Sequence, residues 1–215
     1  QARFSVIGPA VVGKTGRTEA LGRYIVRGVL PGTYTVEAVR SGYVRAEHGQ
    51  RGLDLPGTKP VVEAGQDVDD AVIVLSRAGS VSGTVFDEHG EPLQDAVVQL
   101  LRVRRSSAGL SVIREQRTQA RTDDRGRFKA MTVMPGDYVV SASIPAHLIT
   151  GGVRTAYGPV FWPDGGALGA ASPLQVRPDE EISGLVLTLR PVPVVRVRGV
   201  VRNSTDTPFS GIVRL

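Results

Sequence analysis

The residues that most resemble a catalytic motif lie near the start of the chain, where Gly8, Gly13, Lys14 and Thr15 have the spacing of a phosphate-binding loop. In such a loop the lysine contacts a nucleotide phosphate, but only where a helix follows, because the phosphate binds at the N-terminus of that helix. Here a segment containing several glycines follows, up to Pro31, and it predicts strands and turns instead. We therefore expect no nucleotide binding and no effect of a Lys14→Ala substitution.

Other residue types used in catalysis are isolated or lie in predicted turns. The chain contains no cysteine and no Gly-x-Ser-x-Gly nucleophile motif. Asp123 is expected to accept hydrogen bonds from its own backbone in a turn, with calcium binding as the less favoured alternative. We predict no enzyme and no catalytic, cofactor-binding or metal-binding residue. The histidines, none with a second ligand at metal-binding spacing, are His48, His89 and His147.

The basic charge of the chain permits anionic partners. The net charge is +5, which would suit an acidic polysaccharide. The arginines alternate with core-type residues in many segments, without stacking aromatics between them, so we expect solvated strand faces and no nucleic-acid site. No apolar run approaches the roughly 20 residues that a membrane-spanning helix needs. No membrane insertion is therefore expected.

One aromatic cluster lies in a segment rich in glycine and proline. It contains Tyr157, Phe161 and Trp162, the last being the only tryptophan of the chain. Flat aromatic side chains on a loop can stack on sugar rings, which would make the cluster a ligand-binding site. The alternative, which we favour, is that the three side chains cover the open end of a β-sandwich core.

A repeat indicates the elements that must carry these residues. The strings TEALGRYIVRGVLPGTYTVEA at 18–38 and TDDRGRFKAMTVMPGDYVVSA at 122–142 are identical at nine of 21 aligned positions. Each predicts two strands joined by a type II turn at a Pro-Gly pair, and thus a β-hairpin used twice. After the second pair, alternate residues are expected to face one side, namely Tyr138, Val140, Ala142 and Ile144.

Further apolar patterns predict the remaining strands. Residues 4–7 and 60–64 predict short strands, and residues 112–118 predict an edge strand or a long hairpin arm. Two runs that are apolar on both faces, at 71–75 and 185–189, predict a central strand in each copy. The residues expected to point into the core of the second copy are Val81, Gly83, Val85, Ala96, Val98 and Leu100.

The pattern TDxxGxF followed by PGxYxVxA, with GTVFDEHGEPLQDAV at 83–97 before it, resembles the carboxypeptidase regulatory-like domains. The resemblance implies an all-β chain of tandem transthyretin-like Greek-key β-sandwiches, as found in secreted and surface proteins of bacteria. Residues 1–77 are then a domain that lacks its first strand, and residues 78–191 are a complete domain. Residues 192–215 carry the opening strands of a third copy.

The two incomplete copies are complementary in content. The first has 25 fewer residues before its repeated string than the second, and RVRGVV at 196–201 is similar to SVSGTV at 80–85. A sandwich without its first strand exposes an edge that folded proteins cover or pair, and a strand from another chain can do so. We therefore expect strand donation into the next molecule, or else a fragment cut through two domains. The donor residues would be Val195, Val197, Val201 and Phe209.

These features predict a non-enzymatic structural or adhesive protein, extracellular or on the bacterial cell surface. Its expected partner is another copy of itself, in a homo-oligomer or in a head-to-tail homopolymer. No cofactor is expected. The alternative is a glycan- or peptide-binding accessory module of a larger surface protein or enzyme, with a possible polysaccharide ligand.

Overall fold

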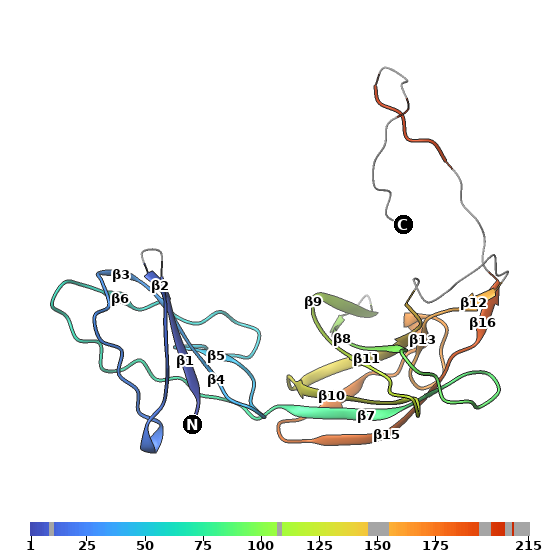
Figure 1. Cartoon of the computed structure of the whole chain (residues 1–215), viewed down its shortest axis with the longest axis horizontal. Helices are drawn as coiled ribbons and strands as arrows, with labels where there is room; N and C mark the ends of the chain where they lie inside the picture. The colour runs from blue at the N-terminus through green and yellow to red at the C-terminus, as the bar shows by residue number, and fades with distance from the viewer. Residues whose placement is uncertain (9–10, 107–108, 146–154, 194–198, 205–207, 209–215) are drawn as a thin grey trace.

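The computed structural model describes the chain except residues 9–10, 107–108, 146–154, 194–198, 205–207 and 209–215. Its regular structure is almost entirely β-strand, which confirms the predicted all-β class. The described helices are 3-10 turns at Ala20–Gly22 (η1) and Leu168–Ala170 (η3), and none could cross a lipid bilayer. Figure 1 shows the strands in two groups side by side, called here the first unit (β1–β6) and the second unit (β7–β16).

The first unit contains one four-stranded antiparallel sheet in the order β2-β1-β4-β5. Its buried face carries Phe4, Val6, Tyr34 and Val36, at alternate positions of two neighbouring segments. A short pair, β3 with β6, closes one end. The strands are β1 (Arg3–Gly8), β2 (Val11–Arg17), β3 (Gly32–Thr33), β4 (Thr35–Val39), β5 (Ala46–Glu47) and β6 (Val61–Val62). The strands predicted near residues 4–7 and 60–64 are thereby confirmed.

The second unit is a sandwich of two sheets. One sheet has the order β10-β7-β15, and the other has the order β9-β8-β11-β13, with β14 also paired to β11. A separate pair joins β12 and β16. The strands are β7 (Gly79–Phe86), β8 (Val97–Ser106), β9 (Gly109–Arg121), β10 (Arg127–Val133), β11 (Gly136–Ser143), β12 (Thr155–Tyr157), β13 (Val160–Phe161), β14 (Leu174–Val176), β15 (Glu181–Thr188) and β16 (Pro191–Pro193).

Alternation along the strands fills the core between these two sheets. Each strand points every second side chain inward, so apolar residues at that spacing meet those of the facing sheet. The predicted inward positions are confirmed with no exposed surface at Val81, Val85, Ala96, Val98 and Leu100, while Gly83 is half-buried. The predicted edge strand is also confirmed, since β9 lies at the end of its sheet.

The repeated string is not a hairpin, as the sequence predicted, but a corner between sheets. Strand β10 pairs with β7, whereas β11, which follows Pro135, pairs with β8 in the opposite sheet. Gly136 has a φ of 155°, and a Cβ there would lie 2.8 Å from Arg102 Nε, so the position requires glycine. A hairpin and a corner have the same sequence pattern of two strands and a turn. Only the strands with which they pair distinguish them.

The prediction of a central strand in each copy is also wrong. Strand β15 lies at the edge of its sheet and pairs in parallel with β7, and Val186 on its outer face is 50% exposed. In the first unit the corresponding residues 71–75 form no strand. Val72 and Val74 are 67% and 77% exposed there. Apolar residues on both faces therefore do not mark a central strand in this chain.

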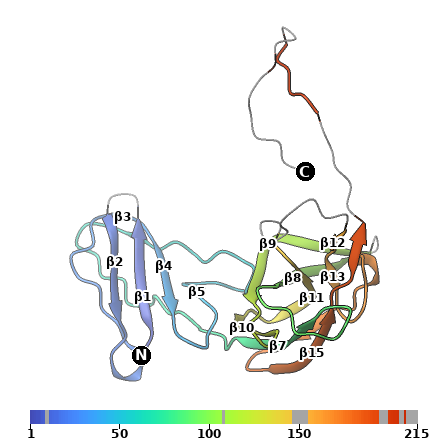
Figure 2. The ribbon, with the colours of Figure 1, turned by 45° about the vertical axis from the view of Figure 1, so that its right-hand side comes forward.

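The two units adjoin in Figure 2, and two ion pairs connect them. Arg77 Nη1 lies 3.2 Å from Asp179 Oδ1, and Arg102 donates to the Asp54 carboxylate. The Arg102 side chain is nearly buried in the second unit and also donates to the Pro135 carbonyl, at 3.2 Å. The described residues 199–204 lie apart from both units in the same view.

Candidate strand-binding groove

The phosphate-loop pattern spans a β-hairpin and holds no nucleotide cradle. Strand β1 ends at Gly8, β2 begins at Val11 and continues as a strand, so the helix that the motif needs is not there. The Lys14 ammonium donates to the carbonyl oxygens of Arg27 and Gly28, the second at 2.7 Å. The expectation that a Lys14→Ala substitution changes nothing is therefore corrected, because both carbonyls would lose this donor.

The described histidines contact backbone or a neighbouring acid. His48 Nδ1 lies 3.0 Å from the Val72 carbonyl oxygen, and His89 Nε2 lies 3.6 Å from Glu88 Oε1. His147 lies outside the described residues. Within the part of the chain that the structure describes, no group of three or more His, Cys, Asp or Glu residues could hold a metal ion.

Asp123 is the turn residue that the sequence predicts. Its carboxylate accepts the backbone N–H groups of Arg127, at 2.8 Å, and Arg125, at 3.0 Å. These bonds, with that from Arg127 foremost, lower the pKa of Asp123, because they favour the ionised form. Asp87 closes its own turn in the same way, and the Glu91 N–H is the main cause of its lowered pKa.

The aromatic cluster lies at the end of the second unit, packed against apolar side chains. Tyr157 and Trp162 contact the main core cluster, and Phe161 contacts a smaller one with Val103 and Val139. All three aromatics are half-buried. The backbone N–H of Trp162 donates to the Val140 carbonyl oxygen of β11 at 2.8 Å. Tyr157 and Trp162 thus pack against one core cluster, and Phe161 packs against another.

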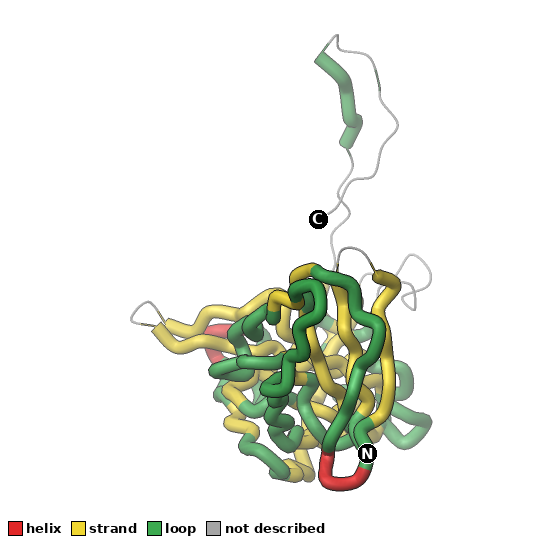
Figure 3. Tube along the Cα trace, turned by 90° about the vertical axis from the view of Figure 1, so that its left-hand side faces the viewer, coloured by secondary structure: helices red, strands yellow, loops and turns green. Residues whose placement is uncertain are grey.

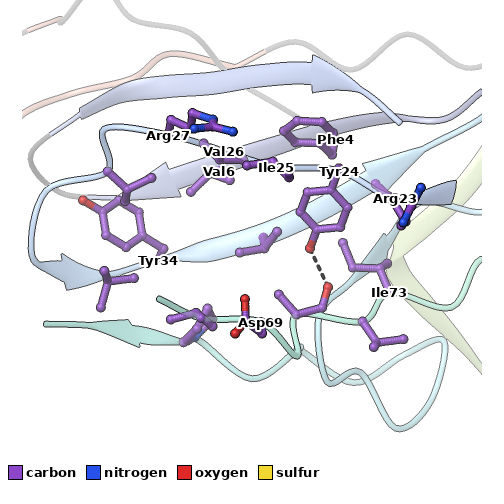
Figure 4. A pocket seen from close by; sticks show the side chains of 18 of the residues that line it. Phe4, Val6, Arg23, Tyr24, Ile25, Val26, Arg27, Tyr34, Asp69 and Ile73 are labelled. Atoms are coloured by element: carbon purple, nitrogen blue, oxygen red, sulfur yellow. Dashed lines mark hydrogen bonds between the residues drawn. The ribbon is translucent and has the colours of Figure 1, made fainter. Parts of the chain in front are cut away.

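A large groove runs along the first unit between residues 23–29 and residues 71–75. We call it the strand groove; its volume is about 1770 Å³, well above the roughly 300–1,000 Å³ of small-molecule sites. Side chains from the sheet, including Phe4, Val6 and Val36, line it. Figure 4 shows this apolar lining. In Figure 3, where the first unit faces the viewer, the chain that leaves η1 is drawn as loop, not strand.

Beside this groove three strands of the first unit correspond to three strands of the second. The order β2-β1-β4 in the first corresponds to β9-β8-β11 in the second. The short pairs beside the corner also correspond, since Gly32 pairs with Val62 as Gly136 pairs with Val176. The two units are therefore built on one plan.

The turn that follows each short pair extends the correspondence. In the second unit the Arg177 N–H donates to the Glu180 carboxylate at 2.7 Å. In the first unit the Gln66 side chain accepts from the backbone N–H three residues earlier, at 3.1 Å. Asp67 follows Gln66 as Glu181 follows Glu180. The wall of the strand groove at residues 71–75 therefore corresponds to residues 185–189, most of them in β15.

The first unit differs from the second in the strand between these walls. In the second unit β7 lies between β10 and β15. The first-unit segments that correspond to β10 and β15, residues 23–29 and 71–75, flank the strand groove, and no strand among the described residues lies between them. The strand groove thus has the position of β7.

Tyr24 crosses the strand groove from one wall to the other. Its ring packs on Phe4, with centroids 4.7 Å apart, and its hydroxyl donates to the Ala71 carbonyl on the opposite wall (Figure 4). Burial raises the pKa of Tyr24. In the second unit Phe128 stands at this place, paired with Gly83 of β7. A strand entering the groove would have to replace the hydrogen bond of Tyr24.

The two rims of the strand groove differ in charge. Glu63, Asp67 and Asp69 line the rim on the side of residues 71–75, and all three are exposed. Arg23 and Arg27 belong to the opposite segment. Figure 4 shows Asp69 across the groove from these two arginines. The rim thus offers carboxylates to a basic strand.

The residues predicted to donate a strand are only partly described. Val195, Val197 and Phe209 lie outside the described residues. Val201 is described and is 43% exposed, and its neighbour Val200 is 69% exposed. The shorter first copy predicted that this unit lacks its first strand. The sequence carried no signal for Tyr24, whose partner Ala71 is distant along the chain.

Comparison with known family models finds a match within the second unit. Residues 80–154 match the family model of the carboxypeptidase regulatory-like domain. This part of the chain is therefore similar to the carboxypeptidase regulatory-like domains. The sandwich of β7 to β11 coincides with the matched region of this domain, and the resemblance inferred from the sequence is confirmed. No curated protein matches the chain in sequence.

Several solved structures show a weak structural similarity to this chain. The minor pilin GBS52 of Streptococcus agalactiae is 14% identical over 92% of this chain and 86% of that chain, with a TM-score of 0.38. The shaft pilin SpaA of Lactobacillus rhamnosus GG is 10% identical over 91% and 86% of the two chains, with a TM-score of 0.33. A C-terminal fragment of the pilus adhesin SpaC from the same organism is 11% identical over 91% of both chains, with a TM-score of 0.25.

Proposed function

We propose that the chain is a non-enzymatic structural or adhesive protein of the bacterial cell surface that polymerises head to tail, because its first unit accepts a β-strand from another copy. The observation that carries this proposal is the strand groove, which lies where the second unit has β7. Strand addition to an open sheet joins backbone hydrogen bonding with pockets for alternate side chains.

Filling the groove would bury apolar surface that is now open. In the second unit Val81 and Val85 of β7 have no exposed surface, and burying such a side chain stabilises by about 1.5 to 3 kcal/mol. An acceptor surface on the first unit and a donor segment elsewhere on the chain make a heterologous contact. Such a contact repeats from molecule to molecule and generates a filament when it does not close into a ring.

Two further observations support a structural role at the cell surface. Lys14 and Asp123, the residues most suggestive of chemistry, are held by backbone hydrogen bonds. The resemblance to carboxypeptidase regulatory-like domains implies tandem modules of secreted and surface proteins, and the second unit matches that family. An accessory module that binds glycan through Tyr157, Phe161 and Trp162 has less support, since these side chains pack against core clusters.

The oligomeric state of the purified chain tests the proposal. We expect sedimentation velocity to detect a concentration-dependent series of oligomers at micromolar protein, and electron microscopy to show filaments. A chain ending at Pro193 keeps β16 and all earlier strands, and it should remain monomeric. A full chain that stays monomeric throughout this range, or a shortened chain that assembles equally well, would overturn the proposal.

A further inference from the structure

We propose that the segment 195–202 of a second copy occupies the strand groove in the register of β7. Asp67 of the acceptor selects this register by pairing with Arg196 and Arg198 of the donor. This inference rests on the proposed function, since it names the strand that the groove takes. It is based on a comparison of this segment with β7 at the apolar, glycine and charged positions.

The apolar positions of the donor segment correspond to those of β7. The donor sequence RVRGVV at 196–201 aligns with SVSGTV at 80–85. Val197 and Val201 then take the places of Val81 and Val85, both fully buried in the second unit. These two side chains would enter the apolar lining of the groove, while Val200 takes the outward place of a threonine.

The glycine position corresponds as well, and it has a steric reason. A Cβ on Gly83 would lie 2.1 Å from the Leu185 carbonyl oxygen, so β7 accepts only glycine where it passes β15. Gly199 stands at this place in the donor, facing Ala71 of the acceptor wall. In its own molecule a Cβ on Gly199 would meet nothing within 4 Å. A substitution there should therefore block insertion without disturbing the folded units.

The charges differ in a complementary way. In the second unit Lys129 Nζ lies 2.7 Å from Glu181 Oε1, and this ion pair joins the two neighbours of β7 across its outer face. In the first unit the acid is kept as Asp67, but Ile25 stands in place of the lysine. In the proposed complex the inserted strand supplies a cation for Asp67.

The register of β7 places the donor arginines beside this acid. Ser80 pairs with Glu181 and Ser82 pairs with Lys129. Arg196, at the place of Ser80, would lie directly opposite Asp67. Arg198, two residues on, points to the same face and reaches Asp67 diagonally. A slip by one residue would turn both arginines toward the core, so the charge and the valines specify one register.

Binding of a labelled peptide of residues 193–204 tests this inference. The acceptor is the full chain carrying Gly199→Val, whose own segment should be unable to insert. We expect saturable binding of the peptide by fluorescence anisotropy. Gly199→Val in the peptide should lower its affinity about tenfold or more. The control Val200→Thr in the peptide should leave the affinity unchanged. Asp67→Arg in the acceptor should weaken binding about two- to fivefold. Peptide carrying Arg196→Asp and Arg198→Asp should recover that loss.

The outcomes separate this inference from the function on which it rests. A second peptide, residues 78–88, carries β7 itself and should bind if the groove takes any strand of this pattern. Binding of that peptide alone would overturn the assignment of the donor and leave strand acceptance standing. Failure of both peptides would overturn the proposed function too. Tolerance of Gly199→Val, or no recovery on charge exchange, would overturn the register.

Discussion

The Tyr138 hydroxyl donates a hydrogen bond of 2.7 Å to the carbonyl of Met134, four residues earlier. Tyr34 makes the equivalent bond to Leu30 at 2.8 Å. Both tyrosines are 2% exposed, and each lies just after a Pro-Gly pair. The bond closes the corner at which the chain leaves one side of the sandwich for the other. The repeat in the sequence is therefore a repeat of this corner.

Replacing Tyr138 with Phe should weaken the second corner. The change keeps the ring and removes one donor, leaving the Met134 carbonyl without it, so we expect a loss of about 0.5 to 1.5 kcal/mol in the free energy of unfolding. Urea unfolding followed by the fluorescence of Trp162 measures it in the second unit. Tyr34→Phe is the matched variant and should leave this transition unchanged. An unaltered Tyr138→Phe transition would contradict the role of the bond.

Lys14 should stabilise the first unit and bind no nucleotide. A Lys14→Met substitution removes the donor to Arg27 and Gly28, and we expect it to lower the stability of the first unit by about 1 kcal/mol. Calorimetry with ATP and GTP should detect no binding to either protein. Lys59→Met, at an exposed site, is the control. Micromolar nucleotide affinity that depends on Lys14 would contradict the hairpin assignment.

Trp162 should contribute to stability through packing. Its ring contacts the main core cluster, and truncating a large core aromatic costs about 3 kcal/mol or more. We expect Trp162→Ala to lower the thermal midpoint of the second unit strongly by circular dichroism. Leu21→Ala, at a site 92% exposed, should have little effect. Unchanged stability together with lost polysaccharide binding would favour the glycan-binding alternative.

The second unit should lose stability in acid. Backbone hydrogen bonds lower the pKa of Asp87 and Asp123 in the folded chain, so each stabilises above its unfolded pKa of about 3.9 and loses that contribution as the pH falls through the folded value. The urea concentration at the midpoint of unfolding should therefore decrease when the pH is lowered below about 4. Asp123→Asn should reduce this acid dependence, and Asp124→Asn should not. Equal acid profiles for both variants would contradict the assignment.

Local patterns were sufficient for much of the second unit. Alternation identified Val81, Val85, Val98 and Leu100 as core residues, because side chains of a strand alternate between its faces whatever the strand pairs with. The turn role of Asp123 was equally predictable, since its hydrogen-bond partners lie within four residues. Strand pairing was not, because the partner of β10 is β7, more than forty residues away along the chain.

The sequence by itself determined the all-β class and the repeat, because composition, alternation and spacing are properties of neighbouring residues. Only the tertiary structure decided that the Pro-Gly pair is a corner, that Lys14 binds two carbonyls and that Tyr24 bridges the strand groove to Ala71. Each of these depends on which distant segments meet. That choice is made by packing of the whole core, which local sequence does not encode.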